Sequence, residues 1–113
     1  MSRFVERLHI TIENDHVFVN NVYFCRAGAG NGRSANLPTG FYEVESQYAH
    51  CMGKVLPKVV GLGWIGADEK CDIVLGAVRT RDGLLGDANS VSRLLNRIED
   101  AEQDGTAVTL EVM

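Results

Sequence analysis

The feature that most constrains the fold is a two-residue alternation of apolar side chains near both ends of the chain. Leu8, Ile10 and Ile12 alternate with polar residues, and the segment from Val108 to Val112 repeats the pattern. A period of two predicts strands with one face in a core, because successive side chains point to opposite faces of a strand. We therefore expect a β-rich domain in which a final strand, at about residues 106–112, pairs near the first one.

Asn and Asp residues mark the turns between the first strands. Glu13-Asn14-Asp15 precedes a returning strand at His16–Val19, and Asn20-Asn21 precedes a third strand at Val22–Cys25. Asn and Asp tolerate left-handed backbone and cap their own amides. We therefore expect an antiparallel opening of three strands.

Glycine and proline divide the middle of the chain. Ala27–Asn36 has three glycines and no large apolar residue, which predicts an exposed loop. A Pro/Gly turn then leads into a strand at Phe41–Tyr48. Val55–Val60 contains Pro57, which supplies no ladder donor, so we expect this strand at a sheet edge. Ile73–Leu75 is short and apolar, as in a buried strand, and Arg79–Gly86 is expected to be a loop.

One amphipathic helix is expected at about residues 90–103. Val91, Leu94, Leu95 and Ile98 form a single apolar stripe at helical spacing. Asn89 or Ser90 is the expected N-cap, and Gly105 suits the left-handed position after the helix. The fold class is α+β: one domain over residues 1–113, with a curved antiparallel sheet or partly closed barrel, one helix and a final strand.

Composition narrows the function classes. The chain has 113 residues, a net charge of −4 and 23% charged residues, and its basic residues are scattered. A nucleic-acid-binding footprint is therefore missing. No run of about 18 apolar residues and no signal peptide is visible, so we expect no membrane partner and a cytoplasmic protein. No cofactor is expected. Edge strands beside Pro57 and at the C-terminus are possible sites of homo-oligomer formation.

Three cysteines carry the main chemical question. Cys25, Cys51 and Cys71 lie 20 or more residues apart without CxxC spacing, so we expect reduced thiols and no metal site. Cys71 alone has a plausible catalytic context, because it lies where a loop enters the apolar strand Ile73–Leu75. A nucleophilic cysteine also needs a base or a positive field. The acidic residues around Cys71 oppose thiolate formation, so a packed, unreactive thiol is the favoured interpretation.

Other candidate residues also have two interpretations. Trp64 and Tyr42 are candidate binding residues, although tryptophan is usually buried. Glu43 and Glu45 form either an acid–base pair or a solvated polar face. His50 and Cys51 are neighbours, which argues against a dyad, because neighbours on an extended chain face opposite sides. The glycines from Gly28 onward lack the P-loop lysine and a following helix.

Several segments, taken in order, resemble a family of small uncharacterised bacterial and phage domains with the pattern IPAGxYEV, GIxIHPGN and GCILVG. The matching segments here are Leu37–Val44, Gly61–Ile65 and Cys71–Gly76, followed by a Gly-Leu loop, the helix and the last strand. That family is in turn similar to L,D-transpeptidase (YkuD-like) domains. The resemblance implies a bacterial, phage or mobile-element origin and a cysteine acyl-transfer site at Cys71.

The chain departs from that pattern where the chemistry would be. The expected histidine falls near Trp64 or Ile65, where none stands, and Gly-Cys has become Lys70-Cys71. Loss of one member of a catalytic unit costs several orders of magnitude in rate. We therefore expect a non-catalytic domain that binds a ligand or partner through its exposed loops. The alternatives are a peptidoglycan-modifying acyl transferase that uses Cys71 and an accessory assembly protein.

Overall fold

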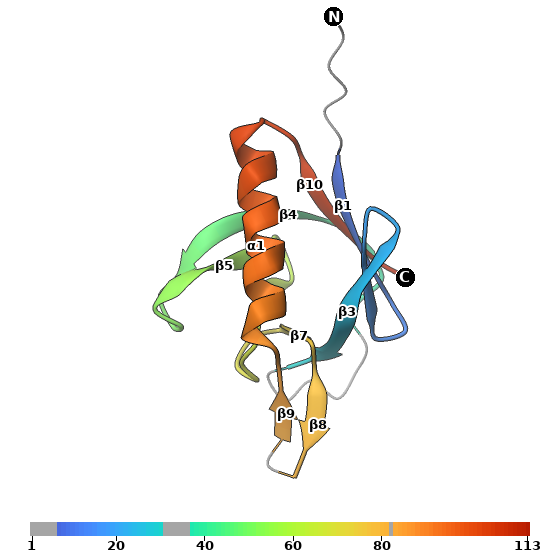
Figure 1. The fold of residues 1–113 in the computed structure, drawn as a ribbon, viewed down its shortest axis with the longest axis vertical. Coiled ribbons are helices and arrows are strands. Elements are labelled where there is room, and N and C mark those ends of the chain that lie inside the picture. The colour runs from blue at the N-terminus through green and yellow to red at the C-terminus, as the bar shows by residue number, and fades with distance from the viewer. Residues whose placement is uncertain (1–6, 31–36, 82) are drawn as a thin grey trace, which may run out of the picture.

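The structure is a computed structural model that describes residues 7–30, 37–81 and 83–113. Within these residues, eight strands close a barrel in the order β1-β10-β4-β5-β6-β7-β3-β2, and β8 and β9 form a separate two-stranded sheet. The helix α1 runs alongside the barrel, and the β8–β9 hairpin extends away from it (Figure 1). The expected β-rich α+β domain with one helix and a final strand is confirmed, and the barrel is fully closed.

The described part of the chain contains ten strands and one helix. They are β1 (Leu8–Glu13), β2 (His16–Val19), β3 (Val22–Ala29), β4 (Gly40–Ala49), β5 (Lys54–Val59), β6 (Gly63–Gly66), β7 (Ile73–Leu75), β8 (Val78–Thr80), β9 (Gly83–Leu85), α1 (Ala88–Gln103) and β10 (Val108–Val112).

The first and last strands close the barrel. β1 pairs with β10 in parallel, from Leu8 opposite Val108 to Ile12 opposite Val112. The apolar residues of both alternations point inward, and Ile10 and Leu110 are at most 1% exposed. Each fully buried side chain of this size stabilises the fold by about 1.5–3 kcal/mol. The pairing of these strands confirms the expectation, but β1–β10 and β6–β7 are parallel, so the sheet is not purely antiparallel.

Both tight turns of the opening hairpins have left-handed backbone. Asn14 and Asp15 have φ of 49° and 65°, and Asn20 and Asn21 have φ of 49° and 67°. Two consecutive residues with positive φ are the mark of a type I′ turn, which matches the twist of the flanking strands. The predicted three-stranded opening is confirmed, because β1 pairs with β2 and β2 with β3 in antiparallel registers.

The expected loop at Ala27–Asn36 is wrong over its first part. Ala27, Gly28 and Ala29 belong to β3 and pair with β7. A glycine is needed directly after β3, because a Cβ on Gly30 would collide with the backbone oxygen of Cys71. Close approach of two backbones, rather than flexibility, therefore explains this glycine. Residues 31–36 of the expected loop lie outside the described residues.

The expected edge position of the Pro57 strand is also wrong. β5 pairs with β4 along its whole length and with β6 at Lys58 opposite Trp64 and Val59 opposite Gly63. The β5–β6 ladder stops one residue short of Pro57, so the missing donor is tolerated inside the sheet. Because β5 and β10 each have a strand on both sides, neither offers the free edge that we expected to mediate oligomers.

Two further segments are more ordered than expected. Gly63–Gly66, a piece interrupted by glycines, is the short strand β6, and the predicted loop at Arg79–Gly86 contains the β8–β9 hairpin. In both cases pairing with a neighbouring strand overrides weak local propensity.

The helix begins two residues earlier than predicted. Asp87 is the N-cap, in place of Asn89 or Ser90, and its Oδ1 accepts the backbone N–H of Asn89 at 3.1 Å. Gly105 has a φ of 71° after the last turn, as expected. Val91, Leu94 and Ile98 are buried, and α1 contacts the consecutive barrel strands from β1 through β10, β4, β5 and β6 to β7. In the described part of the chain, no helix is long and apolar enough to cross a membrane.

Candidate functional site

Cys71 lies in the loop between β6 and β7, at the predicted junction of loop and sheet, but its side chain is only 1% exposed. Its backbone N–H donates to the carbonyl of Asp68 at 2.9 Å, which folds the loop into a tight turn. Its Sγ atom fills the space that a Cβ on Gly66 would need. The loop therefore directs the sulfur into the protein, and the thiol is not presented to solvent.

The surroundings of Cys71 keep its thiol protonated. Burial raises the pKa of the Cys71 thiol above its ordinary value of 9.0, and the hydrogen bond with the Asp68 backbone only partly opposes this. The charges of Asp68, Cys51 and Asp72 raise it further. Because the thiolate is the nucleophilic form, this environment opposes nucleophilic reactivity of Cys71 at neutral pH.

The three imidazoles of the chain are engaged elsewhere. His9 contacts the β10 residues Thr109 and Glu111, His16 packs against Tyr23 with ring centroids 5.6 Å apart, and His50 packs against Tyr48 at 4.9 Å. No histidine is among the groups that act on the Cys71 thiol. Among the described residues, no histidine is therefore paired with Cys71.

A groove with a volume of about 620 Å³ lies beside Cys71. Three segments form its walls: the β4–β5 hairpin with Cys51, Met52, Lys54 and Leu56; the loop 67–70; and Leu85 at the end of β9. Leu56 also packs 3.6 Å from the Cβ position of Gly66, the glycine that contacts Cys71 Sγ. The sulfur thus lies beneath a wall residue of the groove. The volume is in the range of small-ligand sites, about 300–1,000 Å³.

This groove is lined by both apolar and charged side chains. Met52, Leu56, Ala67 and Leu85 supply apolar surface. Lys54 and Lys70 carry positive charge, and Asp68 and Glu69 carry negative charge. The loop 67–70 is ordered in part by the Asp68 carboxylate, which accepts the backbone N–H of Lys70 at 2.8 Å. The groove therefore offers apolar contact together with charges of both signs.

Trp64, a predicted binding residue, is half-buried on β6 and packs against the core. Its backbone is held twice by Asp72: Trp64 N–H donates to Asp72 Oδ2 at 2.9 Å, and Asp72 N–H donates to Trp64 O at 3.0 Å. The Nζ atom of Lys58 lies 5.1 Å from the ring centroid. Trp64 is not among the residues that line the groove.

Tyr42 and the paired glutamates lie on β4, away from Cys71. Tyr42 is half-buried against the core, and its hydroxyl donates to the carbonyl of Pro38 at 2.8 Å. Glu43 is exposed, whereas Glu45 accepts a hydrogen bond from Gln47. β5 separates β4 from β6, so the structure does not bring Tyr42 and Trp64 together at one site.

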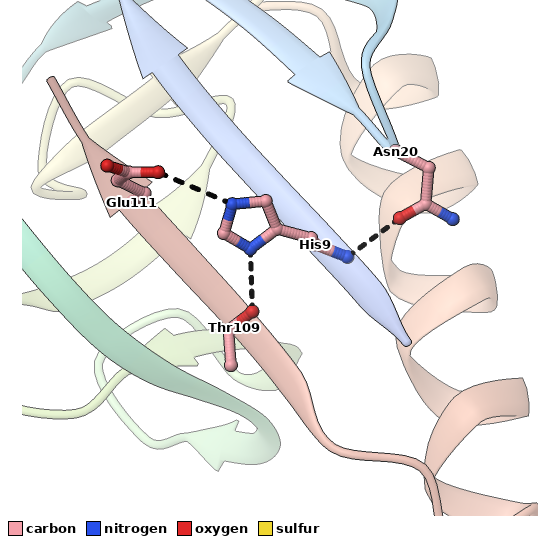
Figure 2. Close-up of polar contacts among 4 residues, drawn as sticks. All are labelled: His9, Asn20, Thr109 and Glu111. Carbon is pink, nitrogen blue, oxygen red and sulfur yellow. Dashed lines mark hydrogen bonds and ion pairs between the residues drawn. The ribbon is translucent and has the colours of Figure 1, made fainter. Parts of the chain in front are cut away.

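His9 forms a polar cluster that the sequence analysis did not find (Figure 2). Its Nδ1 lies 2.7 Å from Thr109 Oγ1, its Nε2 lies 3.5 Å from Glu111 Oε1, and its backbone N–H donates to Asn20 Oδ1 at 2.8 Å. The chemical types match a hydroxyl–imidazole–carboxylate triad, but the cluster lies on the outer face of β1 and β10, apart from the groove. It joins residues 100 positions apart where the barrel closes.

One sequence signal pointed towards the His9 cluster without locating it. The alternation on β1 and β10 places His9 and Thr109 on outward faces, but only the parallel register sets them opposite each other. The groove depends on the β8–β9 hairpin, which the sequence analysis took for a loop. Among the described residues, no group of three or more His, Cys, Asp or Glu side chains is placed to hold a metal ion.

Comparisons of the chain with protein-family models, with curated proteins and with solved structures find no match. The relationship to L,D-transpeptidase-like domains therefore stays a prediction.

Proposed function

We propose that this chain is a non-catalytic binding domain that holds a short polypeptide segment in the groove beside Cys71. The observation that carries the proposal is the combination of an open groove with a sulfur that is closed off beneath it. Cys71 is 1% exposed, whereas Cys51 is exposed on the groove wall. The groove thus offers a contact surface without an activated nucleophile.

The chemistry of the walls favours a ligand with mixed character. Met52, Leu56 and Leu85 suit one apolar side chain, and burying such a side chain contributes about 1.5–3 kcal/mol. The lysines and acidic residues of the groove suit flanking charges of both signs. A peptide with an acidic, an apolar and a basic residue in succession provides the apolar side chain and a flanking charge of each sign.

Acyl transfer by Cys71, the alternative that the family resemblance suggests, requires features that this environment opposes. The thiol would have to lose its proton beside Asp68 and Asp72 and then reach a substrate through the Gly66–Leu56 wall. Nucleophilic cysteines sit instead in electropositive, partly exposed positions. Binding without turnover is therefore the better-supported function.

The proposal is tested by titrating the ¹⁵N-labelled protein with the blocked tripeptide acetyl-Glu-Leu-Lys-amide. We expect saturable amide shifts confined to Lys54, residues 67–70 and Leu85. Because Cys51 lines the groove, saturating peptide should also slow its alkylation by iodoacetamide. Shifts that do not saturate, or that centre on other surfaces, would refute the groove as the binding site.

The chain offers a matched pair of variants for this test. Leu85 and Val78 are cross-strand partners with 62% and 61% exposed side chains, but only Leu85 lines the groove. We expect Leu85→Ser to weaken tripeptide binding at least threefold and Val78→Ser to leave it unchanged. Equal weakening by both substitutions would show that the hairpin acts only through stability.

A second candidate, assembly with another protein, is favoured by a row of side chains on the outer face of the barrel. In the strand registers, Phe41, Glu111, Thr11, Phe18 and Tyr23 follow one another across five strands. Phe41 is 75% exposed and Tyr23 is 52% exposed. Because Thr11 in the middle of the row is only 9% exposed, two separate exposed aromatic side chains, rather than one contiguous apolar patch, support this alternative. Sedimentation of the wild type and of Phe41→Ser tests this: self-association lost in the variant supports it, and a monomeric wild type at high concentration argues against homo-oligomers.

A further inference from the structure

A second cavity lies at the end of the barrel where β1 and β10 finish. Its deepest side chains are Ile12, Ala27 and Val112, which are 5–6% exposed and form the last inward-facing layer of the barrel. Its volume is about 180 Å³. The mouths of β-barrels are a common location for small-ligand sites. This cavity shares no lining residue with the groove and is independent of the function proposed above.

The rim of the mouth carries one acidic side chain. Asn14 and Asp15, in the β1–β2 turn, and Thr39 supply its polar groups, and no lysine or arginine lines it among the described residues. No described residue forms a hydrogen bond or ion pair with the Asp15 carboxylate. The Asp15 carbonyl accepts the N–H of Ala27 at 2.9 Å, which ties the turn to the opposite wall. The backbone of Asp15 is therefore fixed at the rim, while its side chain is exposed.

Size and charge together define the class of ligand. A dry apolar cavity of about 150 Å³ in another protein binds benzene, so a mouth of this volume suits a body of six or seven carbons. A cation on such a body would lie near the carboxylate at the rim. We propose that the barrel mouth binds a small primary amine with an apolar ring or branched alkyl body, and that Asp15 pairs with its ammonium group.

Benzylamine and benzyl alcohol provide matched probes, because they share the ring and differ in charge. Each is titrated at pH 7 into methyl-labelled protein, and the Ile12, Ala27 and Val112 methyl signals are followed. We expect benzylamine to shift all three signals with a dissociation constant in the millimolar range, and benzyl alcohol to bind at least threefold more weakly. Equal binding of the two probes, or no shift up to about 20 mM benzylamine, would overturn the proposal.

Two substitutions locate the charge and the cavity. Asp15→Asn should reduce benzylamine binding to the level of benzyl alcohol, whereas Glu13→Gln, which removes a nearby exposed carboxylate outside the cavity, should leave it unchanged. Ala29→Leu places a larger side chain on the cavity wall and should abolish binding of both probes. If Asp15→Asn fails to fold, the Ala29→Leu variant still tests the cavity, and the comparison of the two probes still tests the role of the charge. Equal effects of the Asp15 and Glu13 substitutions would contradict a specific ion pair between Asp15 and the ammonium group of benzylamine.

Discussion

The Sγ atom of Cys71 occupies the space in which a side chain on Gly66 would begin. The backbone conformation of Gly66 does not require a glycine, because its φ is not positive. The glycine is required by the sulfur next to it. In the same space, the Cβ position of Gly66 lies 3.4 Å from Cys71 Cβ and 3.6 Å from Leu56 Cδ1, which are ordinary contacts. The two residues therefore act as one packing unit beneath the groove.

This relationship predicts a strong coupling between Gly66→Ala and Cys71→Ala. Gly66→Ala alone should destabilise the protein by about 1–3 kcal/mol, because the new methyl group overpacks the site. In the double variant the methyl group enters the space that the sulfur has vacated, so much of the loss should be recovered, with a coupling energy of about 0.5–3 kcal/mol. Urea unfolding of the four proteins gives this value. Additive losses would disprove the packing unit.

Gly30 provides a control for the coupling between Gly66→Ala and Cys71→Ala. A Cβ on Gly30 would meet the backbone oxygens of Cys71 and Glu69, the latter at 2.8 Å, and Val74 Cγ2 at 3.0 Å, but not the Cys71 side chain. Gly30→Ala should therefore destabilise the protein, and Cys71→Ala should not relieve the effect.

The raised thiol pKa values predict a loss of stability at alkaline pH. Burial raises the pKa of both Cys71 and Cys25 above 9.0. A group whose pKa is higher in the folded state stabilises the fold below its unfolded pKa, and this contribution is lost as the pH rises past it. Urea unfolding between pH 7 and pH 10 should show stability falling from about pH 9. The fall should be shallower in Cys71→Ala, because that substitution removes one of the two thiols with a raised pKa.

The cap of α1 predicts the opposite dependence at acid pH. Hydrogen bonds from Ser90 Oγ, at 2.8 Å, and from the Asn89 N–H lower the pKa of Asp87 below 3.8. A lowered folded pKa gives stability above the unfolded pKa that is lost as the pH falls. Asp87→Ala should therefore lower the melting temperature more at pH 7 than at pH 2.5, and Asp100→Ala, at an exposed helix position, should not. A pH-independent effect of Asp87→Ala would contradict this.

The His9 cluster predicts a pairwise interaction across the closure of the barrel. Thr109→Val removes the hydroxyl that lies 2.7 Å from His9 Nδ1 and should cost about 0.5–1 kcal/mol. In a His9→Ala background the same substitution should be neutral or stabilising, because valine suits a strand. Chemical denaturation of the four proteins measures the difference. The same cost in both backgrounds would show that the hydroxyl acts elsewhere.

Much of the fold was predictable from local pattern. The alternation at Leu8–Ile12 and Val108–Val112, the Asn-containing turns and the apolar stripe of the helix each follow from the chemistry of a few neighbouring residues. Two of the failures share a cause, because each depends on a partner distant in sequence. Ala27–Ala29 is a strand only because β7 lies beside it, and Pro57 is internal only because the β5–β6 ladder ends before it.

The candidate site was predictable only in part. The absence of a histidine near Trp64 and the acidic neighbours of Cys71 predict a thiol without a base, and in the structure Cys71 is buried with no histidine among the groups that act on its thiol. The groove was not predictable, because its walls come from three segments that tertiary packing brings together. The parallel register that sets His9 opposite Thr109 was equally hidden, since nothing in either strand specifies the direction of its partner.

The most direct test of the central claim is the rate at which each cysteine is alkylated in the native protein at pH 7.5. Iodoacetamide is added in excess, and peptide mass mapping at successive times gives one rate per cysteine. An inert Cys71 beneath the groove predicts that the exposed Cys51 reacts first and Cys71 last, at a rate limited by opening of the fold. Preferential labelling of Cys71, faster than Cys51 and Cys25, would contradict the account and restore an acyl-transfer role.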